Sequence, residues 1–122
     1  MKNTRSHWIR KFANAFHGIY LGVVGQSSFL FHATAAVVVL SLAYLLSCQA
    51  WQWCVLGLCI GLVLSLELIN SALESLAKGV CHEHNEHVGR ALDIASGAVL
   101  LASIVAAAIG LAIFAMQIVV QM

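Results

Sequence analysis

The chain has 122 residues, of which 61% are hydrophobic and 9% are charged, and it contains no proline. Soluble globular domains average about 45–50% apolar and about 25% charged residues, so the composition excludes that class and predicts an integral membrane protein. The length allows one small domain over residues 1–122, and neither the net charge of +1 nor any basic stripe predicts nucleic acid as a partner.

The first predicted element is an amphipathic helix over about residues 6–24. Large apolar side chains recur there at helical spacing, with polar residues on the other faces. These apolar residues are Trp8, Phe12, Phe16, Ile19 and Tyr20. We expect the helix to lie in the membrane interface, where it either anchors the protein or forms a lid over a lipid headgroup.

Three apolar segments follow, over about residues 29–48, 53–77 and 91–120. Each is long enough to cross a hydrocarbon core of ~30 Å, which takes ~20 helical residues. The expected fold class is therefore an all-α integral membrane protein, with three transmembrane helices after the interfacial helix.

Basic residues predict the topology. They precede the first span and flank the loop between the second and third spans. They are Lys2, Arg5, Arg10, Lys11, Lys78 and Arg90. The positive-inside rule therefore predicts a multi-pass membrane protein with its N-terminus and the loop at 78–90 in the cytoplasm.

Residues 13–66 contain no Asp, Glu, Lys or Arg. A group of polar side chains then follows within the second span. They are Glu67, Asn70, Ser71 and Glu74. At ~100° per residue, these offsets predict that all of them share one stripe of a helix. A charged side chain at the membrane centre costs roughly 3 kcal/mol on insertion scales, so the stripe is interpreted as functional.

The stripe suits two roles equally well on spacing alone, and the first is phosphoryl transfer to a membrane lipid. Its carboxylates, with Asp93 at the start of the third span, suit Mg²⁺, which takes one or two carboxylates plus substrate phosphates. One acid can hold the metal while another accepts the proton of a hydroxyl group. The alternative is that the acids pair with Arg90, Lys78 or the amides and only join helices.

The remaining histidines and the cysteines are not assigned to a functional site. The histidine-rich run at 82–87 is interpreted as a solvated loop rather than a zinc site, because nothing completes a tetrahedral ligand set. His32, at the start of the first span, is expected to be a hydrogen-bonded helix-packing residue. The cysteines show no CxxC spacing and are expected to be small buried hydrophobic residues.

Residues 67–74 (ELINSALE), followed by residues 89–100 (GRALDIASGAVL), closely resemble the signature of the prokaryotic diacylglycerol kinase family, which also contains undecaprenol kinases. The resemblance covers nearly the whole chain. It implies a homotrimer with active sites between neighbouring subunits, MgATP as the phosphoryl donor, and a membrane lipid alcohol, diacylglycerol or undecaprenol, as the acceptor.

The resemblance also implies roles for single residues. Glu67 is expected to be the general base that takes the proton of the lipid hydroxyl, and Asn70 to support it in the same stripe. Glu74 is expected to bind the metal, and Glu83 and Asp93 to lie on the nucleotide side. The residues alone identify these groups but do not distinguish the base from the metal ligand.

The chain departs from the family pattern at three positions. Gln26 stands where the family usually has a metal-binding Glu, and Leu92 replaces a Lys that touches nucleotide phosphates. Lys78 stands at a position that is acidic in the family. We hypothesise that Lys78 replaces the missing cation, the alternative being an ion pair with Glu74. The departures leave open a catalytically weak relative that regulates by binding lipid or nucleotide.

Overall fold

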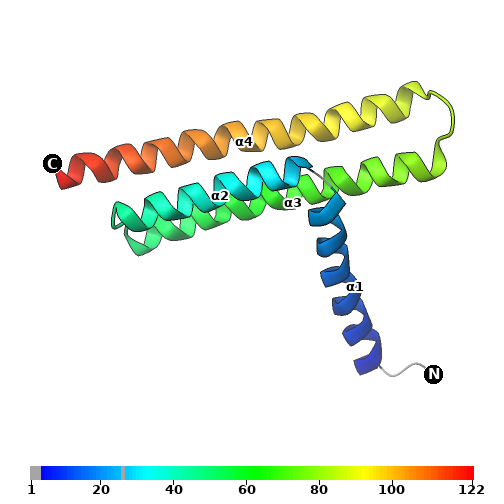
Figure 1. Ribbon diagram of the computed structural model, residues 1–122, viewed down its shortest axis with the longest axis horizontal. Coiled ribbons are helices and arrows are strands. Elements are labelled where there is room, and N and C mark those ends of the chain that lie inside the picture. The colour runs from blue at the N-terminus through cyan, green and yellow to red at the C-terminus, as the bar shows by residue number, and fades with distance from the viewer. Residues whose placement is uncertain (1–3, 26) are drawn as a thin grey trace.

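The computed structural model describes residues 4–25 and 27–122, which fold into helices joined by short connections, with no strand in those residues (Figure 1). Gln26, named as a departure from the family pattern, and Lys2, used to predict the topology, lie outside the described residues. The helices are α1 (Thr4–Gly25), α2 (Ser27–Leu45), α3 (Ala50–Val80) and α4 (Glu86–Gln121).

Helices α2, α3 and α4 lie lengthwise beside one another and form a three-helix bundle (Figure 1). Each of them is long and apolar enough to cross a membrane. The 19 residues of α2 rise about 28 Å, close to the ~30 Å of a hydrocarbon core. The prediction of an all-α fold, with three apolar helices after an N-terminal helix, is confirmed.

The best-packed part of the bundle lies next to the α2–α3 turn. Ala43, Leu56 and Ile113, one residue from each helix, are buried against one another. Beside them the Gln117 Nε2 donates to the carbonyl oxygens of Leu46 and Ser47, at 3.1 Å each. These carbonyls follow the end of α2, where a helix leaves backbone acceptors without intrahelical partners. Gln117 therefore ties α4 to the end of α2.

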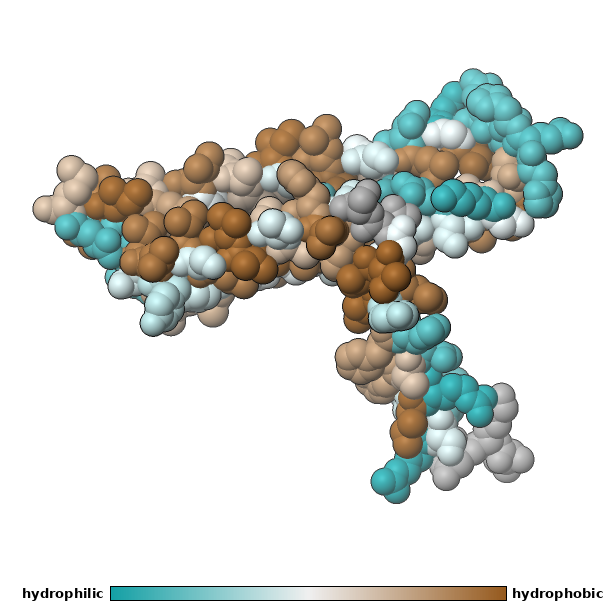
Figure 2. Space-filling model, viewed as in Figure 1, coloured by the Kyte–Doolittle hydropathy of each residue, from teal (hydrophilic) through white to brown (hydrophobic). Residues whose placement is uncertain are grey.

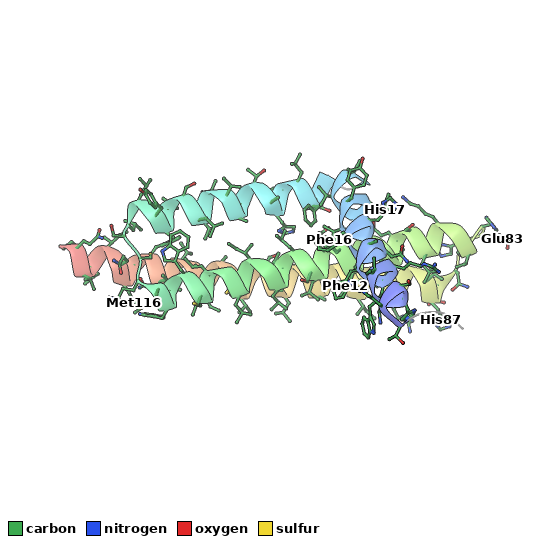
Figure 3. The ribbon with its side chains drawn as sticks, turned by 90° about the horizontal axis from the view of Figure 1, so that it is seen from below. Phe12, Phe16, His17, Glu83, His87 and Met116 are labelled. Carbon is green, nitrogen blue, oxygen red and sulfur yellow. The ribbon has the colours of Figure 1, made fainter. Side chains whose placement is uncertain are left out.

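Helix α1 leaves the side of the bundle at a steep angle and extends away from it (Figure 1). At the junction, a Cβ atom on Gly22 would collide with the Leu68 side chain of α3, so the absence of a side chain lets the two helices approach. Phe12 and Phe16 point to one side of α1 and His17 to another (Figure 3). Phe16 is 70% exposed, which fits the prediction that this apolar side of α1 faces a membrane interface.

The α3–α4 hairpin extends beyond the start of α2. Ser28, in the first turn of α2, contacts Glu67, and α3 continues from there to its end at Val80, a rise of roughly 20 Å. Hydrophilic residues gather at this end of the bundle (Figure 2). We refer to α3 after residue 70, the loop at 81–85 and α4 before residue 96 as the hairpin extension.

Helix α4 begins before the apolar run that predicted it. The Asn85 Oδ1 accepts hydrogen bonds from the backbone N–H groups of His87 and Val88, at 2.9 and 3.2 Å, and so caps the helix. Glu86 and Arg90, one turn apart, add an exposed ion pair at 3.6 Å. Local polar contacts therefore start the helix at Glu86, ahead of residue 91.

Candidate functional site

The carboxylate of Glu67 lies inside the bundle, with 3% of the residue exposed. The Ser28 Oγ donates a hydrogen bond to its Oε1 at 2.6 Å. The His32 Nε2 lies 3.5 Å from its Oε2. Ser28 and His32 are four residues apart and therefore share one face of α2, which presents a polar group to each oxygen of the carboxylate.

The rest of the predicted stripe continues along the same face of α3. Glu67, Asn70 and Ser71 are all buried. The Asn70 Nδ2 donates to Glu74 Oε1 at 3.2 Å, so the amide joins the stripe to the second carboxylate. The structure thus brings together the residues that helical spacing grouped from the sequence.

Two polar atoms of the stripe have no hydrogen-bond partner within the described part of the chain. They are the Asn70 Oδ1 and the Ser71 Oγ, and both are buried. A buried polar atom without a partner typically costs about 1–3 kcal/mol, so such atoms are rare in stable structures and need an explanation. A bound ligand that these two atoms contact would supply one.

Glu83 and Asp93 lie in the hairpin extension rather than beside Glu67. Glu83 is in the loop at the far end of the bundle (Figure 3), and Asp93 is an exposed residue of α4. The contacts of Glu67 run to α2 instead. Lys78 is exposed and lies one helical turn beyond Glu74.

An apolar groove with a volume of about 500 Å³ runs between α2, α3 and α4. Small and branched apolar side chains line it, among them Ala35, Ala36, Val39, Ile60, Val63 and Ala107. His32 is one of its few polar lining residues, and His32 is also the residue that faces Glu67. The groove and the buried carboxylate therefore share a wall residue.

The stripe offers oxygen donors that fit a hard divalent cation. Glu74 supplies a carboxylate, and the Asn70 Oδ1 is a buried acceptor without a partner in the described chain. Mg²⁺ is usually held by one or two carboxylates together with substrate phosphates, so it needs no larger protein set. No group of at least three His, Cys, Asp or Glu residues suited to a metal occurs in the described residues.

Sequence reasoning missed the pairing of Ser28 and His32 with Glu67. Their spacing of four residues at the start of an apolar span was a signal that both could face one polar partner. The partner itself lies 39 residues away from Ser28, and helix spacing alone does not give the register between two helices.

The sequence model of the family described as prokaryotic diacylglycerol kinase matches residues 13–114 of the chain. The chain belongs to the prokaryotic diacylglycerol kinase family. The matched range includes the whole stripe of α3, the α3–α4 loop and most of α4. Family membership makes the chain a multi-pass membrane protein and a lipid kinase.

Relatives within the prokaryotic diacylglycerol kinase family carry two names. The undecaprenol kinase of Bacillus subtilis is 33% identical over 113 residues, which cover 93% of this chain and 92% of that protein. The diacylglycerol kinase of Synechocystis is 39% identical over 100 residues, covering 81% of this chain and 57% of that protein. The diacylglycerol kinase of Escherichia coli K12 is 30% identical over 92 residues, or 75% of each chain.

Proposed function

We propose that this kinase transfers the γ-phosphoryl group of ATP to the hydroxyl group of a membrane lipid, diacylglycerol or undecaprenol, at the cytoplasmic face of the bacterial inner membrane. One observation carries the proposal. The buried carboxylate of Glu67 lies where an apolar groove, suited to a lipid tail, meets a polar hairpin extension, suited to a nucleotide.

In this proposal Glu67 is the general base. A carboxylate has about four lone-pair positions, so the contacts with Ser28 and His32 leave room for the acceptor hydroxyl. As the alcohol oxygen bonds to the γ-phosphorus, its proton passes to Glu67. The bond between the γ-phosphorus and the bridging oxygen breaks, and ADP leaves with that oxygen.

The groove would hold the hydrocarbon tail of the lipid. Its lining is almost entirely apolar, and His32 lies at the level of the base. A tail in the groove would bring the hydroxyl headgroup to Glu67 without taking the lipid out of the membrane. Orienting a reactant in this way can account for a large part of the rate of a transfer reaction.

The nucleotide side of the site would be the hairpin extension. Glu74 and the Asn70 Oδ1 would hold Mg²⁺, and the bound ion would neutralise charge on the phosphates. Glu83 and Asp93 lie in the same extension, and the family resemblance gives them to the nucleotide. Basic residues before α2 and at Lys78 support a cytoplasmic position for this end of the bundle.

A homotrimer with sites between subunits is part of the same proposal. Gly57, Gly61 and Ser65 are exposed on α3 at intervals of four residues, and small residues at that spacing permit close packing between membrane helices. Asp93 is exposed on α4, where a neighbouring subunit could bring its own stripe to it. Both features support assembly through the α3 and α4 faces.

The test is transfer of labelled γ-phosphate from MgATP to diacylglycerol and to undecaprenol by purified protein in mixed micelles. We expect a phosphorylated lipid from the wild-type protein, and about a 10²–10⁴-fold lower rate for Glu67→Gln, the usual loss when a general base is removed. The Gln side chain keeps Oε1 as an acceptor for Ser28. No product with either lipid from folded protein would refute the proposal.

Gln26 and Leu92 favour a second candidate, a catalytically weak relative that binds lipid or nucleotide as a regulator. Gln26→Glu distinguishes the two functions. In an active kinase, the added carboxylate should change the Mg²⁺ concentration that gives half-maximal activity, because a carboxylate holds Mg²⁺ more strongly than an amide does. In a regulator, the same change should produce little activity at any Mg²⁺ concentration.

A further inference from the structure

The two oxygens of Glu67 have different surroundings. Oε1 accepts a hydrogen bond of 2.6 Å from Ser28, a distance typical of a strong O–H···O⁻ contact. Oε2 lies 3.5 Å from the His32 Nε2, which is longer than an ordinary N–H···O hydrogen bond. Oε2 is therefore the less engaged oxygen, and it is the one on the side of the residue that lines the groove.

The His32 ring contacts the ring of its neighbour Phe31. Its centroid lies 5.5 Å from that of Phe31 with an interplanar angle of 81°, the edge-to-face arrangement that aromatic rings prefer. Both residues line the groove, and 16% of the His32 side chain is exposed. The ring therefore forms part of the groove wall while its Nε2 faces the carboxylate.

We propose that Ser28 and His32 are positioning residues for Glu67, and that they make Oε2 the atom that takes the proton of the lipid hydroxyl. The inference rests on the proposed function, in which Glu67 is the base. Ser28 occupies Oε1 and fixes the rotation of the carboxylate. His32 borders both Oε2 and the groove, so it aligns the bound hydroxyl with that oxygen.

The proton transfer to Oε2 takes place within the same phosphoryl transfer that the proposed function describes. The lipid O–H bond breaks, and the proton forms a bond with Oε2. The alcohol oxygen bonds to the γ-phosphorus, and the bridging oxygen leaves with ADP. Ser28 keeps its own proton throughout and donates it to Oε1 as a hydrogen bond.

The competing interpretation is that both residues only join α2 to α3. A joining role predicts that their loss lowers the stability of the fold, and that each folded molecule keeps its rate. A positioning role predicts a loss of kcat in folded protein, because a displacement of about 1 Å at a reacting group can cost about 10²-fold in rate. The Michaelis constant for ATP should not change, since neither residue lies in the hairpin extension.

The experiment compares Ser28→Ala and His32→Phe with the wild-type protein in the lipid phosphorylation assay. For each variant, kcat per folded molecule, the KM values for lipid and ATP, and the thermal unfolding midpoint are measured. We expect kcat to fall about 10- to 100-fold, and the KM for ATP to stay within twofold. Thr34→Val is the matched control, because Thr34 lies on the same helix, is exposed, and donates to the Leu30 carbonyl oxygen of its own helix.

Two further variants keep the test decisive if His32→Phe does not fold. His32→Gln retains an N–H donor and should recover a large part of kcat. In the Glu67→Gln background, Ser28→Ala should lower the residual rate no further, because its effect acts through the carboxylate.

Two outcomes would overturn the inference while leaving the kinase proposal standing. One is wild-type kcat in Ser28→Ala and His32→Phe, from a protein that Glu67→Gln inactivates. The other is a loss of activity that follows the loss of folded protein, with the rate per folded molecule unchanged. If the wild-type protein phosphorylates neither lipid, the proposed function fails instead, and the positioning role fails with it.

Discussion

Replacing Lys78 with Met separates two roles for this cation, which lies in the last turn of α3. Lys78 is exposed and lies one turn after Glu74. If it only pairs with Glu74, the ion pair contributes about 0.3–0.5 kcal/mol, so its loss changes the free energy of unfolding by no more than that. If it contacts a nucleotide phosphate, the charged hydrogen bond contributes about 1.5–3 kcal/mol. At about 1.4 kcal/mol per factor of ten, the KM for ATP then rises about 10- to 150-fold.

The assay is lipid phosphorylation with ATP titrated at saturating Mg²⁺ and lipid, together with an unfolding curve for each variant. Lys78→Arg keeps the charge and should stay near the wild-type KM for ATP. Lys11→Met is the control for loss of one positive charge, because Lys11 is on α1, 5.1 Å above the Trp8 ring. An unchanged KM for ATP in Lys78→Met would refute the idea that Lys78 replaces the missing family cation.

Three further predictions test other parts of the structure. Glu74→Gln should raise the Mg²⁺ concentration for half-maximal activity at least tenfold, which corresponds to about 1.4 kcal/mol of metal affinity. An unchanged Mg²⁺ titration would show that Glu74 is not a Mg²⁺ ligand. Ala36→Phe should narrow the groove and raise the KM for lipid without changing the KM for ATP, whereas Val38→Phe, 53% exposed on the same helix, should change neither. Gln117→Leu should lower the free energy of unfolding by about 1–3 kcal/mol, since it removes two hydrogen bonds to the end of α2. Met116→Leu, one residue away and exposed, is its control. Equal unfolding curves for the two variants would contradict the role of Gln117 in joining α4 to the end of α2.

The helices of this kinase were predictable because its apolar runs are long and contain few charges. The ends of the helices were harder to predict, because polar contacts decide them. Helix α4 starts at Glu86 because Asn85 caps it, although the apolar run begins later. Helix α3 likewise ends at Val80, beyond the predicted apolar span. A helix can continue into water, and its polar residues there do not contribute to a hydropathy signal.

The site was predictable where it depends on one helix only. Helical spacing grouped Glu67, Asn70 and Ser71 on one face, and all are buried on α3. The neighbours that α2 brings to Glu67 were not predictable, because the register between two apolar helices depends on side-chain packing. His32 was expected to be a hydrogen-bonded packing residue, and its Nε2 does face a carboxylate, but the sequence could not identify that partner.

The position of Glu67 along the bundle explains why the acidic residues are spread over two turns of α3. A lipid hydroxyl stays near the membrane boundary because its tail is held in hydrocarbon, and nucleotide phosphates stay in water because desolvating them is costly. If the ~28 Å length of α2 matches the hydrocarbon core, the contact of Ser28 with Glu67 brings the proposed base to that boundary. Glu74, seven residues further, is about 10 Å closer to the polar end, where phosphates can reach it. A base at the boundary and a metal ligand beyond it would let the two substrates meet while each stays in its own solvent.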